Sequence, residues 1–474
     1  MKFKTKPLVK KLIFTAALSV TIFSIIFWSH DSGVSARTQD TYKNLEAFSN
    51  VLSIIQKNYV EDVDTQQIIE GAIKGMLSSL DPHSSYMKPD DFKELKVETQ
   101  GSFSGIGIEI TMKDGILTVV SPIEGTPAFK KGLKAGDKII KIGDETTSDL
   151  TLVQAVKKLR GPKGSNVTIS IHRKGWTDLK EITIVRDDIP LQSVKSKMLE
   201  PGYGYLRIIN FQSKTTTDFK KALKDLTNDN DIKGLVLDLR NNPGGLLDQA
   251  VKISDVFIDD GIIVSTKGRI KEQNMVFKAH SAGTSYDFPL VVLVNEGSAS
   301  ASEIVAGALQ DHKKAIILGA QTFGKGSVQT IIPINNGAGL RLTTAKYYTP
   351  SGISIQAKGI TPDIVVPTEV HNNREEPAAS KKKPKFLREK DLKHHIENGN
   401  ESEEGEPAEE DIEGKNSSDE LEPAEDKNKK IIDDKDSEKS EEELIKESIE
   451  KDNQLRTALT LLKGLNVFGG LKTP

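Results

Sequence analysis

Residues 289–329, which indicate the fold class, read "PLVVLVNEGSASASEIVAGALQDHKKAIILGAQTFGKGSVQ". Two short apolar runs, "PLVVLVN" and "KAIILGA", flank a segment whose apolar residues recur at helical spacing from Ile304 to Leu309. This order predicts a strand, a helix and a second strand, with Lys325 in a glycine-flanked loop after the second strand. Because consecutive strands of a parallel sheet end at the same edge, we expect Ser300 and Lys325 to meet there.

The same alternation begins upstream of this stretch. "YGYLRI" and "IKGLVLDLR" are typical of buried strands, whereas "TTTDFKKALKDL" and "LLDQAVKISDVF" are typical of helices. Residues 340–366 predict further strands that close the domain. We therefore predict an α/β core with a parallel-rich sheet over residues 189–371.

The serine-rich turn has two interpretations. Ser300 followed by Glu303 is a capping box, which explains the segment without any catalytic role. Alternatively, Ser300 is a nucleophile, because the amides and dipole at a helix start stabilise the oxyanion of acyl transfer. A nucleophilic serine needs a base within hydrogen-bond reach, and the candidates are His83 in "DPHSSYM" and Lys325.

Lysine is a base only when it is uncharged, which burial in a desolvated pocket favours by lowering its pKa. Gln329 lies four residues after Lys325, where a hydrogen bond from its side chain would hold the amine. Upstream, "NNPGG" contains Gly245 and reads either as a simple turn or as a pair of glycines that aim amides into a cleft.

Residues 98–188 change character. "GIGIEI" at 105–110 and "SPIEGTPAFKKGLKAGDKIIKIGD" at 121–144 closely resemble a PDZ domain. The resemblance implies that a peptide adds as a strand to the sheet edge and that loop amides bind its terminal carboxylate. A small β domain without a ligand is the alternative. The predicted carboxylate loop consists of Gly105, Ile106, Gly107 and Ile108.

The ends of the chain differ strongly in composition. "MKFKTKPLVKK" carries five lysines, and residues 12–28 carry no charge, so residues 1–36 predict a signal peptide or a membrane anchor. The rest of the chain is then expected in the periplasm or at the outer face of the cytoplasmic membrane. Residues 37–97 predict helices, and such a helical pair needs a partner surface, for which a second copy of the chain is one candidate.

The C-terminal part begins with a charged linker. Residues 401–450 hold 22 acidic and 7 basic residues, and residues 372–440 predict a disordered segment. Residues 441–474 predict a helix that docks on the core through Leu455, Leu459 and Leu462. The chain contains no cysteine, which excludes disulfides and a thiol nucleophile.

Three motifs together closely resemble the carboxy-terminal processing peptidases, also called tail-specific proteases: "GSASASEI", "QDHKKAIILGAQTFGKGSVQ" and "LVLDLRNNPGGLL". The likeness covers most of residues 40–366. It implies that Ser300 is the nucleophile, that Lys325 is the general base and that Gln329 supports the lysine. It also implies an oxyanion hole formed by the amides of Gly245 and Ala301, with neither a metal nor a cofactor.

The function expected from this resemblance is that of an exported serine endopeptidase that cleaves proteins at or near apolar C-terminal tails. Nucleic acid is not an expected partner, whereas a homo-oligomer and a regulatory partner acting through the PDZ or C-terminal region are open alternatives. A rival interpretation is a non-catalytic, membrane-tethered PDZ adaptor. A hydrolase of small esters is disfavoured, because the GxSxG motif of that fold is absent.

Overall fold

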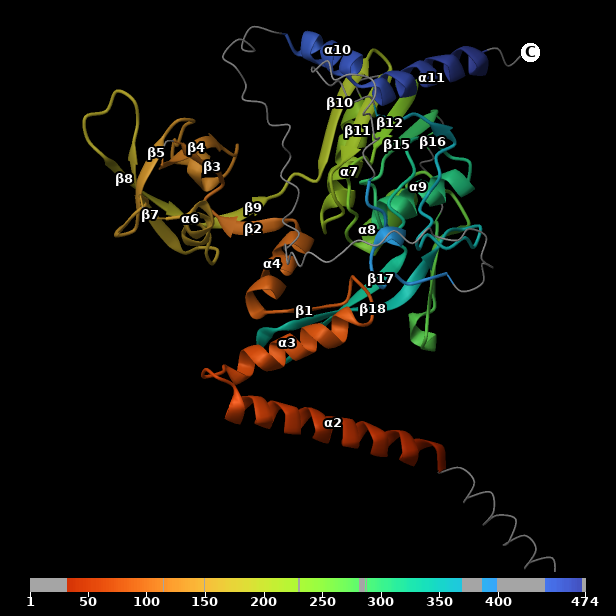
Figure 1. Cartoon of the computed structure of the whole chain (residues 1–474). Coiled ribbons are helices and arrows are strands. Elements are labelled where there is room, and N and C mark those ends of the chain that lie inside the picture. Colours follow the sequence, from red (N-terminus) through yellow and green to blue (C-terminus); the bar gives the residue numbers. More distant parts are fainter. Residues whose placement is uncertain are drawn as a thin grey trace, which may run out of the picture. The chain divides into compact units, whose positions relative to one another are not determined.

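The structure is a computed structural model, and it divides the chain into two compact units, residues 1–76 and 77–474 (Figure 1). The predicted hydrophobic segment at residues 12–28 lies outside the described residues. Among the helices that are described, none is both long and apolar enough to cross a membrane. The described residues are 32–113, 115–148, 150–228, 231–280, 286, 288–368, 386–398 and 440–470.

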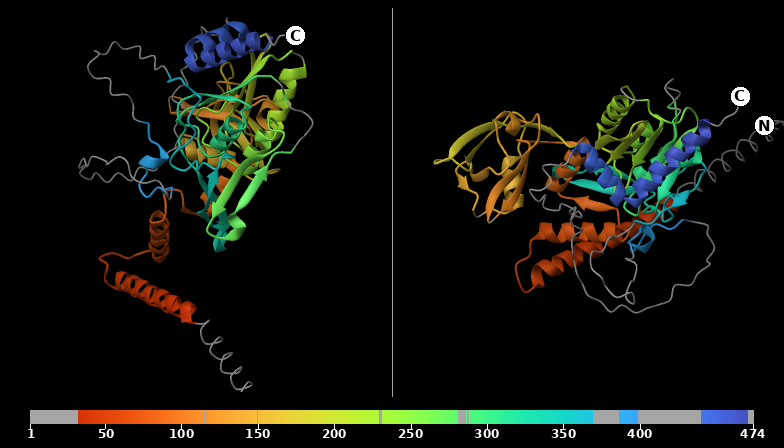
Figure 2. Two further views of the ribbon diagram at one scale, coloured as in Figure 1. Left: turned by 90° about the vertical axis from the view of Figure 1, so that its right-hand side faces the viewer. Right: turned by 90° about the horizontal axis from the view of Figure 1, so that it is seen from above.

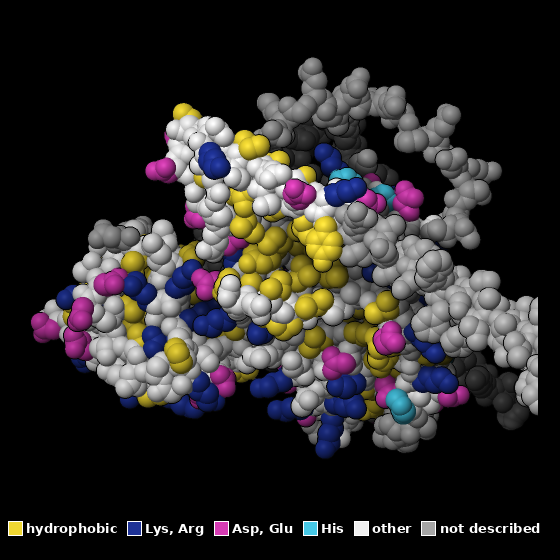
Figure 3. Space-filling model, turned by 90° about the horizontal axis from the view of Figure 1, so that it is seen from below, with side chains coloured by type: hydrophobic (Ala, Val, Ile, Leu, Met, Phe, Trp, Pro, Cys, Tyr) yellow, Lys and Arg dark blue, Asp and Glu magenta, His cyan; other side chains and the backbone are white. Residues whose placement is uncertain are grey.

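The first unit is helical, as predicted. It contains α2 (Ser32–Asn58) and most of α3 (Thr65–Ser78). The predicted apolar stripe is present on α2, yet Leu45 and Phe48 are 57% and 46% exposed within the chain. Figure 3 shows hydrophobic side chains gathered at the centre of the face seen from below.

A small β domain occupies the region predicted as PDZ. Its sheet has the strand order β3-β4-β5-β7-β8, with β6 paired to β5. A threonine–glutamine capping box, Thr151 with Gln154, starts its longer helix. The strands are β3 (Ile108–Lys113), β4 (Ile116–Pro122), β5 (Lys138–Ile142), β6 (Glu145–Thr146), β7 (Asn166–His172) and β8 (Lys180–Val185), and the helices are α5 (Pro127–Lys130) and α6 (Leu152–Leu159).

Two further strands flank this domain in the chain. They are β2 (Ser102–Gly105) and β9 (Asp187–Pro190), which pair antiparallel, so the chain enters and leaves the domain side by side. The core of this β domain is a separate cluster of buried side chains, among them Leu117, Ile139 and Ile169.

The core is built on a six-stranded sheet of order β10-β11-β12-β15-β16-β19. All neighbouring pairs from β11 onward are parallel, whereas β10 is antiparallel to β11. This agrees with the predicted parallel-rich α/β core. The strands are β10 (Val194–Glu200), β11 (Tyr203–Ile208), β12 (Gly234–Asp238), β15 (Leu290–Val294), β16 (Ile316–Gly319) and β19 (Ile364–Val365).

Helices cover both faces of this sheet, which explains why its central strands β12 and β15 are buried at every position. One face packs on α7 (Thr215–Asn228), α8 (Leu247–Ser254) and α9 (Ala301–Asp311). The other face packs on the C-terminal helices, drawn in blue in Figure 2. Leu455, Leu459 and Leu462 are buried there against Val236 and Val291, as the docking prediction requires.

The C-terminal segment departs from the prediction in one detail. It forms two helices, α10 (Glu441–Lys451) and α11 (Asn453–Gly470), because the helical conformation is interrupted at Asp452. The Asp452 carboxylate accepts hydrogen bonds from Arg240 at 2.7 and 2.9 Å. This contact fixes the start of α11 at the end of β12.

A second sheet, which is antiparallel, was only partly predicted. Its order is β1-β18-β13-β14, with β17 paired to β18. The predicted strands near residues 340–366 correspond to β18 and β19, whereas β17 directly after Lys325 was not anticipated. The strands of this sheet are β1 (Ser85–Met87), β13 (Ile262–Gly268), β14 (Met275–Lys278), β17 (Ser327–Pro333) and β18 (Gly339–Tyr348), and α4 (Pro89–Gln100) follows β1.

The predicted disordered linker at 372–440 needs a correction. Residues 386–398 within it are described, contain the short 3-10 helix η3 (Glu389–Asp391), and pack on the core. Composition misses this because the acidic run starts only after residue 400, and residues 386–398 include Phe386, Leu392 and Ile396. The remaining residues of the predicted linker, apart from Ser440, lie outside the described part of the chain.

Candidate active site

Ser300 lies at the turn between β15 and α9 in an unusual backbone conformation. Its φ is 55° and its ψ is −112°, a region that residues with side chains rarely adopt. The Ser300 N–H donates to Glu303 Oε2 at 2.7 Å, and the Ser300 carbonyl accepts from the Glu303 N–H at 2.9 Å. These bonds hold the strained residue at the first turn of α9.

The hydroxyl groups of the neighbouring serines are hydrogen-bonded, unlike that of Ser300. The buried hydroxyls of Ser298 and Ser302 donate to the carbonyls of Leu239 at 2.8 Å and Asn242 at 2.9 Å. Both therefore fasten the turn to the loop after β12. The Ser300 hydroxyl makes no capping bond, so only the Glu303 half of the predicted capping box is present. Among the three serines, Ser300 alone has a hydroxyl that no described residue engages.

Glu303 joins this turn to the lysine loop. Its Oε2 also accepts from the Lys325 N–H at 2.9 Å. A single carboxylate oxygen therefore links the backbone nitrogens of Ser300 and Lys325. Its Oε1 accepts from the Thr322 hydroxyl at 2.6 Å and from the Gly324 N–H at 2.7 Å. Burial raises the pKa of Glu303 to about 7, although these four donors act against it.

The lysine loop is held closely by its surroundings. A side chain at Gly326 would place its Cβ 2.2 Å from the Gln356 nitrogen, so this position has room only for glycine. Burial lowers the pKa of the Lys325 amine, and the Arg341 guanidinium acts in the same direction. The carboxylates of Glu389, Glu303 and Asp81 act against this shift. Desolvation therefore favours the uncharged amine that a base needs.

Gln329, predicted to hold the lysine amine, makes different contacts. It lies on β17, and its Nε2 donates to Ser327 Oγ at 2.8 Å and more weakly to the Ser327 carbonyl at 3.3 Å. In the described part of the chain, no hydrogen bond joins Gln329 to Lys325. The sequence spacing of four suits one helical turn, whereas here the residues belong to a loop and an extended strand.

The "NNPGG" loop passes directly beside Ser300. A Cβ at Gly244 would lie 2.8 Å from the Ser300 Cβ, and a Cβ at Gly245, where φ is 140°, would lie 2.2 Å from the Phe211 carbonyl oxygen. Phe211 pairs with this loop through the Gly244 carbonyl and the Leu246 N–H, and this pairing gives the Gly245 N–H no acceptor. The loop is a close approach of backbone that only glycine permits.

The amides predicted for the oxyanion hole are free to bind a ligand. Among the described residues, neither the Gly245 N–H nor the Ala301 N–H donates an intramolecular hydrogen bond. Ala301 is the first residue of α9, where unpaired amides and the positive end of the helix dipole coincide. The site thus combines an unengaged hydroxyl, a desolvated amine and two free donors.

Comparisons with known proteins identify the family. Residues 202–366 match the family described as peptidase family S41, residues 104–184 match the PDZ domain, and residues 28–91 match the N-terminal domain of the activating protease CtpB. The chain is 47% identical over 403 residues to a carboxy-terminal-processing protease of Bartonella bacilliformis, covering 84% of this chain and 91% of that protein.

The chain belongs to the carboxy-terminal processing proteases of peptidase family S41. It is also 36% identical to the carboxy-terminal processing protease CtpA of Bacillus subtilis, covering 75% of this chain and 76% of that protein. It is 39% identical to the carboxy-terminal processing protease CtpB of the same organism, covering 68% of this chain and 68% of that protein. The predicted family, fold class and enzyme class are therefore confirmed.

The protease's second predicted binding element is the loop at the start of the PDZ sheet. The carbonyl of Ile106 accepts from Ala128 N at 2.9 Å, and that of Gly107 accepts from Ile123 N and the Thr126 hydroxyl, each at 3.0 Å. Neither the Ile106 N–H nor the Gly107 N–H has an acceptor among the described residues. The loop thus presents amides, the groups that a terminal carboxylate requires.

His83, the alternative base, has another partner in the protease. Its Nε2 lies 2.8 and 2.9 Å from the two carboxylate oxygens of Glu389, which is fully buried. Sequence reasoning missed this partner, because Glu389 lies in the segment predicted as disordered. It also restricted Glu303 to the capping box, since the bonds to residues 322–325 arise only in three dimensions.

Proposed function

We propose that this chain is an exported serine endopeptidase that cleaves proteins at or near their C-terminal tails with a Ser300–Lys325 dyad. The observation that carries the proposal is the Glu303 carboxylate, one oxygen of which accepts from the backbone N–H of both residues. Around that link, the Ser300 hydroxyl is unengaged and burial lowers the pKa of Lys325.

The dyad works in two steps. The neutral Lys325 amine takes the Ser300 proton as Oγ attacks the scissile carbonyl, and the ammonium returns that proton to the leaving amine. The amides of Gly245 and Ala301 bind the tetrahedral oxyanion, and an acyl-enzyme remains. Water then attacks this ester with the same amine as base, which releases the acid and restores Ser300.

Substrate selection belongs to the PDZ domain in this proposal. A protein with an apolar C-terminal tail adds as a strand to the PDZ sheet, and its carboxylate binds the amides of Gly105–Ile108. Gly107 supports this role, because its φ of 79° and its contact with Thr126 keep the loop in one conformation.

Localisation and assembly extend the proposal. The lysine-rich start and the uncharged residues 12–28 support export to the periplasm or the outer face of the cytoplasmic membrane, with the N-terminal segment as signal or anchor. The exposed apolar side chains of α2, such as Leu45 and Phe48, support self-association. A regulatory partner would act through the PDZ domain or the C-terminal region.

The test is incubation of the chain with a defined protein that ends in an apolar tail, followed by mass spectrometry of the products. We expect internal cleavage near the tail by the wild type and none by Ser300→Ala or Lys325→Ala. Lys224→Ala, which removes an exposed lysine on α7, is the matched control and should keep its activity. Equal cleavage by Ser300→Ala would instead favour the non-catalytic PDZ adaptor, with a contaminant as the source of activity.

A further inference from the structure

Residues 386–398, called here the docked segment, pack beside the lysine loop. The Glu389 N–H donates to the Phe323 carbonyl at 3.2 Å, and Arg388 Nη1 donates to Gln321 Oε1 at 3.1 Å. Further along, the Ser354 hydroxyl donates to Asn398 Oδ1 at 2.8 Å. The match to peptidase family S41 ends at residue 366, so this segment lies beyond it.

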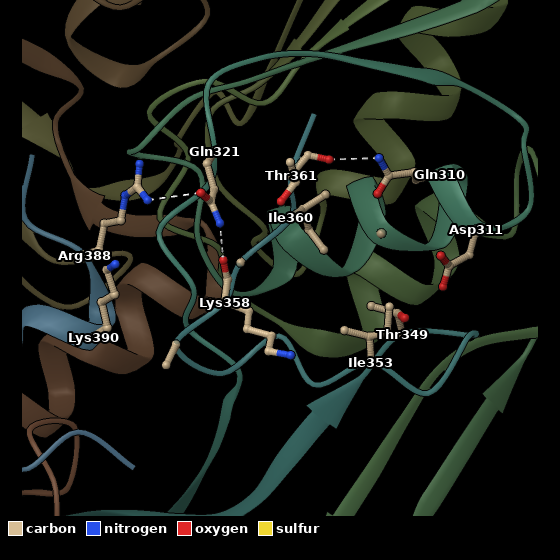
Figure 4. Close-up of a pocket in the computed structure, with 13 residues that line it drawn as sticks. Gln310, Asp311, Gln321, Thr349, Ile353, Lys358, Ile360, Thr361, Arg388 and Lys390 are labelled. Atoms are coloured by element: carbon tan, nitrogen blue, oxygen red, sulfur yellow. Dashed lines mark hydrogen bonds between the residues drawn. The ribbon is translucent and has the colours of Figure 1, made fainter. Parts of the chain in front are cut away.

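Figure 4 shows the start of this segment at a cavity of about 520 Å³. Arg388 and Lys390 lie on one side of it, and Arg388 points to Gln321, which in turn donates to the Lys358 carbonyl at 2.6 Å. The docked segment is therefore joined to the chain on both sides of the lysine loop, before it at Gln321 and after it at Ser354.

Glu389 is the residue that fastens the segment. Its carboxylate is fully buried and is bound by His83 and by Gln356 Nε2, the latter at 2.8 Å. A buried carboxylate is costly unless such partners satisfy it, and removing it leaves those partners unsatisfied in turn. Docking and the arrangement of His83 and Gln356 therefore depend on each other.

Gln356 passes this contact to the lysine loop. Its Oε1 accepts from the Gly326 N–H at 3.0 Å, one residue after Lys325, while its Nε2 donates to Glu389. A side-chain amide has one acceptor end and one donor end, so the carboxylate fixes which end faces Gly326. The Gly326 N–H selects the same orientation, because it needs the oxygen end while the carboxylate needs the nitrogen end.

Charges also connect the segment to the lysine. The groups that act on Lys325 are Arg341 on β18, Glu303 on α9, Asp81 in the loop before β1, and Glu389. Glu389 is the one supplied by the docked segment, and His83 faces it from the Asp81 loop. A carboxylate beside an amine favours the charged amine.

We propose that Glu389 is a positioning residue for Lys325, and that the protease is active only while residues 386–398 are docked. The proposal rests on the proposed Ser–Lys function. Through Gln356, Glu389 fixes the backbone beside the base, and its charge sets the pH at which the base becomes neutral. A chain whose segment is released would bind substrate tails but cleave them slowly.

The experiment compares Glu389→Gln with Glu397→Gln in the full chain. Glu397 lies on the same segment and is exposed. It contacts the core through its backbone carbonyl, which accepts from Lys346. Glu397→Gln therefore removes the same charge from the segment and serves as the matched control. With a tailed substrate, we expect Glu389→Gln to lower kcat about 10- to 100-fold with KM nearly unchanged, because a misplaced base is costly. The base limb of its pH–rate profile should move to lower pH, and Glu397→Gln should match the wild type.

Gln356→Ala separates position from charge. It keeps the Glu389 carboxylate but removes the bond to Gly326, so kcat should fall while the base limb stays near its wild-type pH. This variant also serves if Glu389→Gln fails to fold. A wild-type kcat in Gln356→Ala, a faster Glu389→Gln enzyme, or a slower one with an unmoved base limb would each overturn the proposal.

Hydrogen exchange provides a readout that does not need catalysis. In a Ser300→Ala background, Glu389→Gln should speed exchange in a peptide covering residues 321–329, whereas Glu397→Gln should not. If Ser300→Ala itself remained active, the Ser–Lys function would fail while this exchange result still tested the positioning role. Unchanged exchange would contradict positioning even if the dyad were proved.

Discussion

Two glycine-rich loops of this protease present free backbone amides, and the two loops serve different purposes. In the PDZ loop, the N–H groups of Ile106 and Gly107 are free, and the loop is held by Thr126 and neighbouring backbone. Beside Ser300, the N–H groups of Gly245 and Ala301 are free, and two titratable groups with shifted pKa values, Glu303 and Lys325, lie nearby.

The titratable groups separate a catalytic loop from a binding loop. Glycine supplies exposed amides in both places, because each loop needs a backbone conformation or an approach that a Cβ would prevent. Free amides suffice to hold a carboxylate that is already charged. Acyl transfer also needs a base that has lost its proton, and burial around Lys325 favours that state.

Of the changes that compare the two loops, Gly245→Ala should have the greatest effect, and it should break the catalytic loop alone. Its Cβ would lie 2.2 Å from the Phe211 oxygen, so the loop must shift and its amide leave the oxyanion. We expect kcat to fall about 10²- to 10³-fold, as for loss of one oxyanion donor. Gly352→Ala, at a positive-φ glycine with open space around it, is the control for strain and should stay active.

Glu303→Gln should uncouple the serine turn from the lysine loop. An amide nitrogen cannot accept a hydrogen bond, whereas both oxygens of the carboxyl group can, so two of the four groups that now donate to Glu303 lose their acceptor. We expect a loss of about 2 to 4 kcal/mol in the free energy of unfolding at low pH and a strong fall in kcat. Denaturant unfolding gives the first quantity, and an unchanged midpoint would contradict the role assigned to Glu303.

The same carboxyl predicts a pH dependence of stability. Its pKa in the fold, about 7, is higher than its ordinary value near 4.5, so between these values the folded state binds more protons than the unfolded state. Stability should therefore fall as pH rises through this window, by up to about 3 kcal/mol. The difference between wild type and Glu303→Gln isolates this contribution, and a difference that does not vary with pH would refute it.

Gly107→Ala should affect the PDZ loop alone. A Cβ there would lie 2.3 Å from the Thr126 Cβ at a φ of 79°. We expect KM for a tailed substrate to rise about tenfold, equivalent to about 1.4 kcal/mol, with kcat at saturation nearly unchanged. Gly115→Ala, a positive-φ glycine in the same domain with open space, should leave KM unaltered. A fall in kcat alone would mean that the two loops are not separable.

The smallest effect is expected for Arg341→Gln. The guanidinium disfavours the charged amine, so its removal should raise the pKa of Lys325 and move the base limb to higher pH. The rate at neutral pH should fall a few-fold, with full recovery at alkaline pH. Arg269→Gln, at an exposed turn, is the charge-matched control. A limb that moved to lower pH would contradict the assignment of the base.

Much of this arrangement could be predicted from the sequence because it is local. The apolar run of β15 and the helical spacing of α9 fix the turn that contains Ser300, and the glycines around Lys325 mark a tight loop. The orientation of Gln329 toward Ser327 was not predictable, since spacing cannot distinguish a strand from a helical turn before β17 is known. Glu389 and His83 are 306 residues apart in the sequence, and no pattern in the linker predicts their contact.

The most direct test of the dyad is the titration of the Lys325 amine by NMR in Ser300→Ala, alongside the pH–rate profile of the wild type. We expect Lys325 to titrate below its usual value of about 10.4 and the base limb of activity to follow the same transition. Titration at or above that value, with the amine charged wherever the enzyme is active, would contradict lysine as the base.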